Sequence, residues 1–336
     1  MKRYNKFNFV FFLSTIPGVS EFVLSDAYIL SNVRVINFSI IRTKKGLGIN
    51  FSPYRPPNNP SVFISPSSFD VNSPQLFTQD FPTKQVPVFF FWANDYNIFR
   101  AFNFFNHLRR NYPGCKLVCW LANPIHYYQN AQKIFVDKAT TDEFLSTFDC
   151  VLTYIKLDAM DYGMTYFKGS YSVLPYEQPK LSSDVFFVGR PKDRLEKILR
   201  AYESFKAAGL ICDFYINDIP NPPAIKAEGL HFNEYLSYTD VLKHVLRSRA
   251  VLDIAQRGTY GLTVRYFESL AYNKNFITDN PFYRQDRFAS PKLFFIDRSL
   301  EIDKEQFMAA AKLSNNYKNE YSPLYLINFL ESFLNS

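Results

Sequence analysis

The stretch AVLDIAQRGTYGLTVRYFESLAYNKNFITDN, Ala250–Asn280, decides the fold. It opens with a short apolar run, passes through a turn with two glycines, continues as a helical pattern and ends in a second apolar run. We expect a strand over Ala250–Ile254, a helix over Thr263–Tyr272 with Thr263 as its N-cap, and a strand over NFIT. Strand, turn, helix and strand in this order are the unit of a parallel sheet covered by helices.

The same alternation continues on both sides of this stretch. Further strands are expected at FNFVFFLS, VPVFFFWA, CKLVCWLA, CVLTYI, DVFFVG, CDFYI and KLFFI. Helices are expected over Tyr96–Asn111, Thr141–Ser146, Lys192–Ala208, Ser237–Arg249, Phe307–Ser314 and Pro323–Leu334. The fold class is therefore α/β, with two Rossmann-like doubly wound domains facing each other across a cleft.

A segment of Gly, Pro, Ser and Tyr without helical or strand period, Gly163–Ser183, separates two such units. We expect a first α/β domain over residues 1–175 and a second over residues 180–316. Residues 317–336 are expected to form a C-terminal helix that packs back on the first domain. The length of 336 residues agrees with two packed units.

The charge of the chain is unevenly distributed. The net charge is +7, and residues 1–110 hold 12 Lys or Arg against 5 Asp or Glu, so this first third carries all of it. A basic first domain favours an anionic partner, such as a lipid headgroup, a polyprenyl-diphosphate acceptor or nucleic acid. Ordinary solubilising charge is the alternative. No RNA-binding or zinc-finger motif is present, so we do not expect nucleic acid.

The N-terminus and the cysteines suggest a reduced, cytoplasmic protein. Met1–Arg3 followed by an apolar run imitates a signal peptide, but Pro17 interrupts the run and no small-residue cleavage site follows. No stretch reaches the roughly 20 apolar residues that span a bilayer, so any membrane contact is expected to be peripheral. The four cysteines and four histidines have no metal-binding spacing, and no metal site is expected.

Two loops after expected strands have chemistry suited to phosphate. In VGRPKDR the strand ends at Gly189, and Arg190, Lys192 and Arg194 follow at the start of a helix. A glycine lets the backbone approach a ligand closely, and three cations beside helix amides can hold a diphosphate. The alternative is a solvated basic helix start.

The second loop lies inside Ala250–Asn280. Gly258 and Gly261 precede the Thr263 cap, which directs the next amides toward an anion. Arg265 and Glu268 are three residues apart and share a helical face, so a phosphate-binding cation lies beside a carboxylate able to accept ribose hydroxyls. A surface Arg–Glu pair within the helix is the alternative.

The residues of this second loop resemble a known group. LDIAQRGTYGLTVRYFESLAYNKNFITDN is similar to the donor-site segment of bacterial GT-B fold glycosyltransferases that assemble capsule, lipopolysaccharide or exopolysaccharide. FDCVLTYIKLDAMDYGMTYF and FFVGRPKDR resemble the interdomain and phosphate segments of that group. The resemblance covers roughly Val86–Asn280. It implies a nucleotide-sugar donor in the second domain and, in the first, a glycan or a polyprenyl-diphosphate-linked acceptor.

The resemblance also implies roles for single residues. It assigns Arg265 to the diphosphate and Glu268 to the ribose. It assigns backbone contacts with phosphate to Gly261, Leu262 and Thr263. Many retaining members carry a second glutamate eight positions before the first, where this chain has Tyr260, so the stereochemical outcome stays open.

The mechanism implied is metal-independent and needs no cofactor, because no DxD-type motif lies in a suitable loop and cations can stabilise the leaving group. An inverting enzyme also needs a general base. Asp95 and His126 follow strands of the first sheet and are candidates, with Asp158 and Asp161 as weaker ones. A non-catalytic sugar-nucleotide-binding subunit is the alternative function. A dinucleotide-dependent oxidoreductase is disfavoured, because Gly46-Leu47-Gly48 lacks a third glycine.

Overall fold

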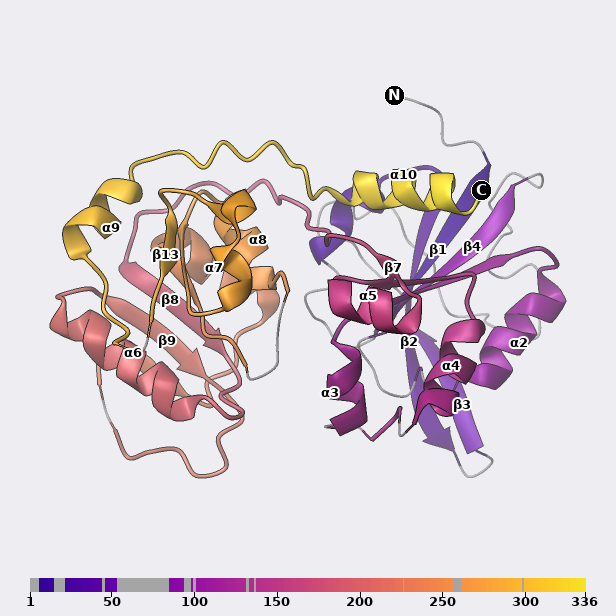
Figure 1. Cartoon of the computed structure of the whole chain (residues 1–336), viewed down its shortest axis with the longest axis horizontal. Helices are drawn as coiled ribbons and strands as arrows, with labels where there is room; N and C mark the ends of the chain where they lie inside the picture. The colour runs from indigo at the N-terminus through magenta and orange to yellow at the C-terminus, as the bar shows by residue number, and fades with distance from the viewer. Residues whose placement is uncertain are drawn as a thin grey trace. The chain divides into compact units, whose positions relative to one another are not determined.

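The computed structural model describes residues 6–14, 22–43, 46–52, 85–93, 98, 101–130, 133–135, 137–225, 227–256, 261–297 and 299–336 (Figure 1). The chain divides into two compact units. Unit 1 comprises Met1–Ser172 with Tyr321–Ser336, and unit 2 comprises Val173–Glu320. Each unit is built on one sheet with helices on both faces.

Unit 1 contains a seven-stranded sheet in the order β3-β2-β1-β4-β5-β6-β7. Its strands are β1 Phe7–Ser14, β2 Val33–Thr43, β3 Gly46–Ser52, β4 Val86–Ala93, β5 Lys116–Leu121, β6 Cys150–Thr153 and β7 Thr165–Tyr166. Neighbouring strands are parallel except β2 and β3, which pair antiparallel at the edge.

Helices cover the two faces of the first sheet with different partners. They are η1 Ser25–Ala27, α2 Phe102–Asn111, α3 Ile125–Asn130, α4 Lys138–Ser146, α5 Lys156–Tyr162 and α10 Pro323–Phe333. On one face, Phe91 packs against α2 through Phe105 at a ring distance of 5.1 Å. On the other, Phe11 meets Tyr28 after η1. Because successive strand residues alternate between faces, the apolar runs of this sheet are buried on both sides.

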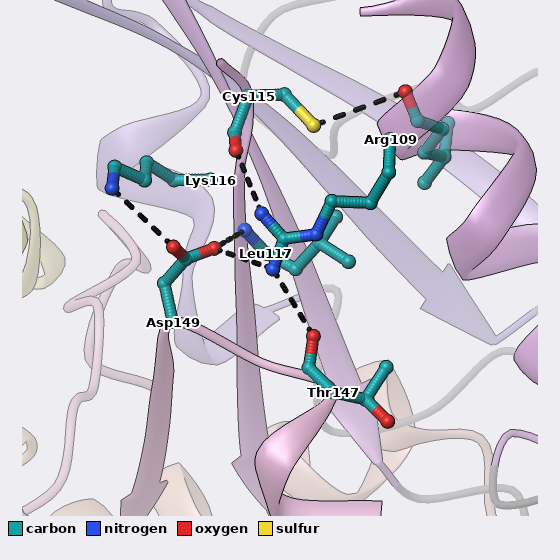
Figure 2. A network of polar contacts seen from close by, with 7 residues as sticks. Arg109, Cys115, Lys116, Leu117, Thr147 and Asp149 are labelled. Atoms are coloured by element: carbon teal, nitrogen blue, oxygen red, sulfur yellow. Dashed lines mark hydrogen bonds and ion pairs between the residues drawn. The ribbon is translucent and has the colours of Figure 1, made fainter. Parts of the chain in front are cut away.

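A polar network fixes the amino ends of two neighbouring strands in unit 1 (Figure 2). The Arg109 guanidinium donates to the carbonyls of Cys115 and Thr147 at 3.0 and 3.1 Å and pairs with Asp149 at 2.9 Å. Asp149 also accepts the amide of Leu117 at 2.8 Å. The end of α2, the start of β5 and the turn between α4 and β6 are thereby held together.

Unit 2 contains a six-stranded parallel sheet in the order β10-β9-β8-β11-β12-β13. Its strands are β8 Ser183–Gly189, β9 Cys212–Ile216, β10 Leu230–Phe232, β11 Ser248–Asp253, β12 Asn275–Thr278 and β13 Leu293–Phe295. Its helices are α6 Leu195–Ala207, α7 Tyr238–Arg247, α8 Val264–Ala271, η3 Pro281–Arg284, η4 Asp286–Phe288 and α9 Lys304–Ala310. The direction of strand succession reverses at β8, whose neighbours are β9 and β11. Such a switch point is where ligands bind in sheets of this kind.

The helices of unit 2 also divide between the faces of their sheet. Phe187 packs against Phe214, which in turn meets Tyr202 of α6. Phe186, the preceding residue on β8, stacks instead on His244 of α7 at 5.4 Å. A core on both faces leaves the loops at the strand ends as the parts of unit 2 that are available to a ligand.

The observed elements confirm the α/β class with two Rossmann-like units and differ from the expected bounds in places. The helix expected from Lys192 begins at Leu195, because Pro191 to Arg194 forms a turn in which the Arg194 amide bonds to the Pro191 carbonyl at 2.9 Å. Four strands, β2, β3, β7 and β10, and the helices α3 and α5 were not predicted. None of the described helices is long and apolar enough to cross a membrane.

The glycine before β10 gives a sharp test of the second sheet. Gly229 has φ +74°, and a Cβ there would lie 1.9 Å from the Cys212 carbonyl oxygen. We expect Gly229→Ala to lower the free energy of unfolding of unit 2 by about 3 kcal/mol, from left-handed strain plus a forced backbone shift. Urea unfolding followed by far-UV circular dichroism measures the loss.

Gly209→Ala is the matched control. Gly209 also has positive φ, +73°, but its Cβ would meet the Lys304 ammonium at 2.9 Å, the end of a flexible side chain. We expect about 1 kcal/mol from strain alone. Equal losses in the two variants would contradict the packing around Gly229.

Candidate functional site

The two loops singled out in the sequence lie beside each other in unit 2. Strands β8 and β11 are parallel neighbours, with Val185 opposite Ala250 and Phe186 opposite Val251. Parallel neighbours end at the same edge of a sheet. The loops after Gly189 and after Asp253 therefore meet, although more than 60 residues separate them along the chain.

Side chains of the first loop are bonded to the second. The Arg194 guanidinium donates to the carbonyl oxygens of Ile254 and of Arg190. Lys192, whose φ is +49°, donates from Nζ to the Gln256 side-chain oxygen at 2.7 Å. Arg190 is exposed and pairs with Asp218 at 2.5 Å. The three cations predicted to hold phosphate are thus gathered at one edge, and Arg194 braces the two loops.

The second loop leads into α8 as expected. Thr263 is the N-cap, with its hydroxyl accepting the Tyr266 amide and its own amide donating to the Tyr283 hydroxyl at 3.0 Å. The Gly261 carbonyl accepts from the Asn280 side chain at 3.5 Å, and Leu262 is buried. First-turn amides of a helix have no intrahelical acceptor and suit an anion. Gly258, Tyr260 and Asp95 lie outside the described residues.

Arg265 and Glu268 form a pair that is buried, not the surface pair considered as the alternative. Arg265 donates to one Glu268 oxygen at 2.5 Å, and the Tyr238 hydroxyl of α7 donates to the other at 2.9 Å. The Glu268 side chain is fully buried, and 14% of the Arg265 side chain is exposed. In this conformation the Glu268 carboxylate anchors the Arg265 guanidinium.

Two further acidic residues complete the site and were not singled out in the sequence. Asp253, the last residue of β11, is buried and lies 3.4 Å from the Thr278 hydroxyl. Asp279, the next residue after β12, accepts the Ala255 amide at 2.6 Å and pairs with Lys197 of α6. Their position after adjacent parallel strands was the available signal, because such positions share one edge.

Burial and neighbouring charges set the protonation behaviour of these groups. Burial raises the pKa of Asp253 to about 6, with Arg194 and Arg265 opposing the shift and Asp279 adding to it. Burial also raises the pKa of Glu268, and Arg265 opposes that shift. Desolvation and the charges of Arg194 and Arg190 lower the pKa of Lys192. The site therefore couples buried carboxylates to a cluster of cations.

The acid–base candidates of unit 1 are brought together only in part. His126 lies in the first turn of α3, and the buried Asp158 of α5 accepts the Ile125 amide at 2.9 Å. Burial raises the pKa of Asp158, and the charge of His126 opposes the shift. Among the residues that the structure describes, no group of three or more His, Cys, Asp or Glu is placed to hold a metal ion.

A cavity of about 470 Å³ in unit 1 has none of the predicted site residues among those that line it. It is lined by Phe102, Phe105, Asn106, Arg109, Leu117, Glu143, Ser146 and Thr147. The guanidinium at its wall is the one engaged by Asp149 and two carbonyls in Figure 2. The loops of unit 2 form the better candidate for a ligand site than this cavity, because polar groups of several elements converge at those loops.

Comparison with known proteins identifies the fold. No protein-family model and no curated protein matches the amino-acid sequence. OtsA in its apo form superposes with a TM-score of 0.55 at 11% identity, covering 98% of this chain and 99% of that one. A protein assigned as a UDP-N-acetylglucosamine 2-epimerase from Listeria monocytogenes gives 0.52 at 12%, covering 98% and 96%. An alpha-glucosyltransferase in complex with UDP and DNA gives 0.50 at 10%, covering 97% and 94%.

These similarities extend over nearly the whole of each chain, so both units and their succession are shared. Identities near 10% reveal a common fold and carry no statement about activity. The GT-B fold that the sequence predicts is confirmed.

The buried carboxyl of Asp253 makes stability depend on pH. Its folded pKa of about 6 exceeds the ordinary 3.8, so the folded state keeps this proton longer than the unfolded chain. Stability from this group is therefore lost as pH rises from about 4 to about 6, and the deficit persists above that window. An asparagine at this position does not titrate, so this loss is absent from Asp253→Asn. We expect the free energy of unfolding of Asp253→Asn, relative to that of the natural chain, to rise by up to about 3 kcal/mol between pH 4 and pH 7.

Urea unfolding of both proteins at several pH values measures this difference. Asp184→Asn is the control. Asp184 is a buried carboxylate of the same unit, but it pairs with Arg249 at the amino ends of β8 and β11. A difference between Asp253→Asn and the natural chain that is constant with pH would show that Asp253 ionises normally.

Proposed function

We propose that the protein is a glycosyltransferase that moves a sugar from a nucleotide-diphosphate donor to a hydroxyl of a glycan or lipid-linked glycan. One observation carries the proposal. Lys192 and Arg194 of the loop after β8, and Arg265 in the capped first turn of α8, converge at the switch point of the second sheet. Amides and cations at such an edge are suited to a diphosphate.

In this proposal the leaving nucleoside diphosphate is stabilised by charge already in place. Arg265 and Lys192 contact the phosphate oxygens, and the first-turn amides of α8 add hydrogen bonds. Arg194 and Glu268 do not contact the phosphates in this proposal. Arg194 holds the two loops together, and Glu268 holds the Arg265 guanidinium in place. Fixed donors aimed at the oxygen where charge develops lower the barrier without reorganising at the moment of reaction.

The acceptor hydroxyl needs a group to take its proton if the reaction inverts the anomeric centre. His126 is the described candidate, with the buried Asp158 beside it to stabilise the imidazolium. Asp95 follows β4 in the sequence and is the second candidate. Both follow strands of the first sheet, where such loops carry binding residues.

The solved structures of the same fold support a sugar nucleotide as the ligand. One of them holds UDP, and another is assigned to the epimerisation of a UDP-sugar. An epimerase of the sugar nucleotide is therefore the second candidate function. A transferase consumes donor only with an acceptor or water, whereas an epimerase changes the sugar while the nucleotide stays attached.

The sequence resemblance supports a place in surface polysaccharide assembly, with capsule and lipopolysaccharide as the glycans concerned. The excess of 12 Lys or Arg over 5 Asp or Glu in residues 1–110 suits a polyprenyl-diphosphate acceptor. Peripheral contact with the anionic inner face of the cell membrane follows from the same charge.

Thermal shift with UDP-glucose, GDP-mannose, CDP-glucose and dTDP-glucose tests the donor site. A ligand present at about 100 times its dissociation constant adds about 2.7 kcal/mol to the folded state. We expect one of the four to raise the melting temperature, and Arg265→Ala to abolish the rise relative to its own ligand-free baseline.

Arg249→Ala is the matched control. Arg249 is also paired with a carboxylate, Asp184, but lies at the amino end of β11, at the opposite edge of the same sheet. We expect it to keep the full ligand-induced rise. A rise that survives Arg265→Ala would remove the diphosphate from this site, and nuclear magnetic resonance of the sugar nucleotide would separate transfer from epimerisation.

Turnover without a divalent ion is the second test. Because cations of the chain neutralise the leaving group, we expect donor hydrolysis to keep its rate within about twofold in excess EDTA. Release of the nucleoside diphosphate measures this rate. Full loss of hydrolysis in EDTA, restored by Mg²⁺, would contradict the proposed charge stabilisation.

A further inference from the structure

A buried carboxylate occupies the centre of the candidate donor site, and the proposed chemistry does not use it. Asp253 ends β11, the strand from which the second loop departs, and its residue exposure is 8%. Its nearest described hydrogen-bond partners are hydroxyl groups, those of Thr278 and Thr263. A negative charge therefore lies buried where a second anion is expected to bind.

Charged groups and a hydroxyl from four elements surround this carboxylate. Arg194 comes from the loop after β8, Arg265 and Glu268 from α8, Asp279 from the end of β12, and the Tyr283 hydroxyl from η3. The two guanidiniums attract the Asp253 charge, and the two carboxylates repel it. The Arg265 guanidinium is already shared with Glu268, and Lys197 is taken by Asp279.

A diphosphate that binds at this cluster would change both the attraction and the repulsion that act on the Asp253 charge. It would draw the positive charge of Arg265 toward its own oxygens, and it would add negative charge close to Asp253. Two unit charges a few ångströms apart near a protein surface repel by several kcal/mol, enough to favour a neutral carboxyl. A proton on Asp253 relieves the repulsion, because the described hydrogen-bond partners of this carboxylate are hydroxyl groups, whereas Asp279 keeps Lys197.

We infer that Asp253 is a proton-coupled positioning residue, which takes up a proton from solvent when the diphosphate of a sugar nucleotide binds and gives it back on release. The inference rests on the proposed function, because it assumes that the anion binds beside Arg265. In the free state the charged Asp253 carboxylate attracts the Arg194 and Arg265 guanidiniums. In the bound state the neutral carboxyl leaves the Arg265 guanidinium to the phosphates.

The coupling has a definite size and sign. The free-state pKa of about 6 leaves about a tenth of Asp253 protonated at pH 7. A rise of about one pKa unit on binding brings that fraction to about a half, an uptake of about 0.4 proton. Affinity for the sugar nucleotide then falls about fivefold from pH 6 to pH 8.

Isothermal titration calorimetry in two buffers of different ionisation enthalpy measures the uptake directly. The probes are UDP-glucose, GDP-mannose, CDP-glucose and dTDP-glucose, whose diphosphate groups are diesters and do not titrate near pH 7. We expect about 0.4 proton taken up by the natural chain at pH 7. We expect Asp253→Asn to bind with no uptake and with an affinity that is flat from pH 6 to pH 8.

Asp184→Asn is the matched control, because Asp184 is a buried carboxylate of the same unit that pairs with Arg249 at the amino ends of β8 and β11. It should keep the proton uptake. Binding of a probe without proton uptake would overturn the inference and leave the proposed function standing, as would uptake that persists in Asp253→Asn or is lost in Asp184→Asn. Absence of binding by all four probes at pH 6 would overturn both.

Discussion

The pairing of β8 with β11 is the constraint on which the candidate site depends. These two strands are separated in the chain by α6, β9, β10 and α7, yet they lie side by side in the sheet. Parallel pairing sends both chains out at one edge, and it leaves the helices that follow on opposite faces. Both predicted phosphate loops owe their proximity to this pairing, and the pairing of β11 with β12 brings Asp253 and Asp279 together beside them.

The site that results is crowded with charge and almost self-neutralised. Arg190, Lys197 and Arg265 each pair with a carboxylate, and Arg194 and Lys192 are bonded to oxygens of the neighbouring loop. Buried ion pairs contribute little net stability because desolvation offsets their attraction. Their value here is geometric, since a guanidinium already held by a carboxylate has little conformational freedom left to lose on binding.

The sequence was most informative where local pattern and burial agree. Apolar runs such as VPVFFFWA and DVFFVG, together with the Thr263 cap, predict β4, β8 and the start of α8 to within a residue or two. Prediction failed where short-range pattern competes with tertiary contacts. The α6 start was placed too early because a proline suits the first helical turn, whereas here Pro191 begins a tight turn.

Long-range contacts account for the rest of what the sequence could not reveal. Arg265 and Glu268 are recognisable as a helical pair, but their burial follows from Tyr238, a residue of another helix. Asp253 and Asp279 look like ordinary strand-end residues until the order of β11 and β12 is known. Each depends on which strands become neighbours, and no single window of sequence contains that information.

The C-terminal segment ties the ends of the chain into one unit. Tyr321–Ser336 belongs with Met1–Ser172, and the Tyr321 carbonyl accepts the Tyr171 amide at 2.7 Å while Ser322 bonds to Asp26. Unit 2, by contrast, is one continuous segment. During synthesis on a ribosome, the whole of unit 2 is made before α10, so unit 2 can fold first. Unit 1 is completed only after α10 has been synthesised. The amino-terminal half is thus the later one to mature, because α10 follows the whole of unit 2 in the chain.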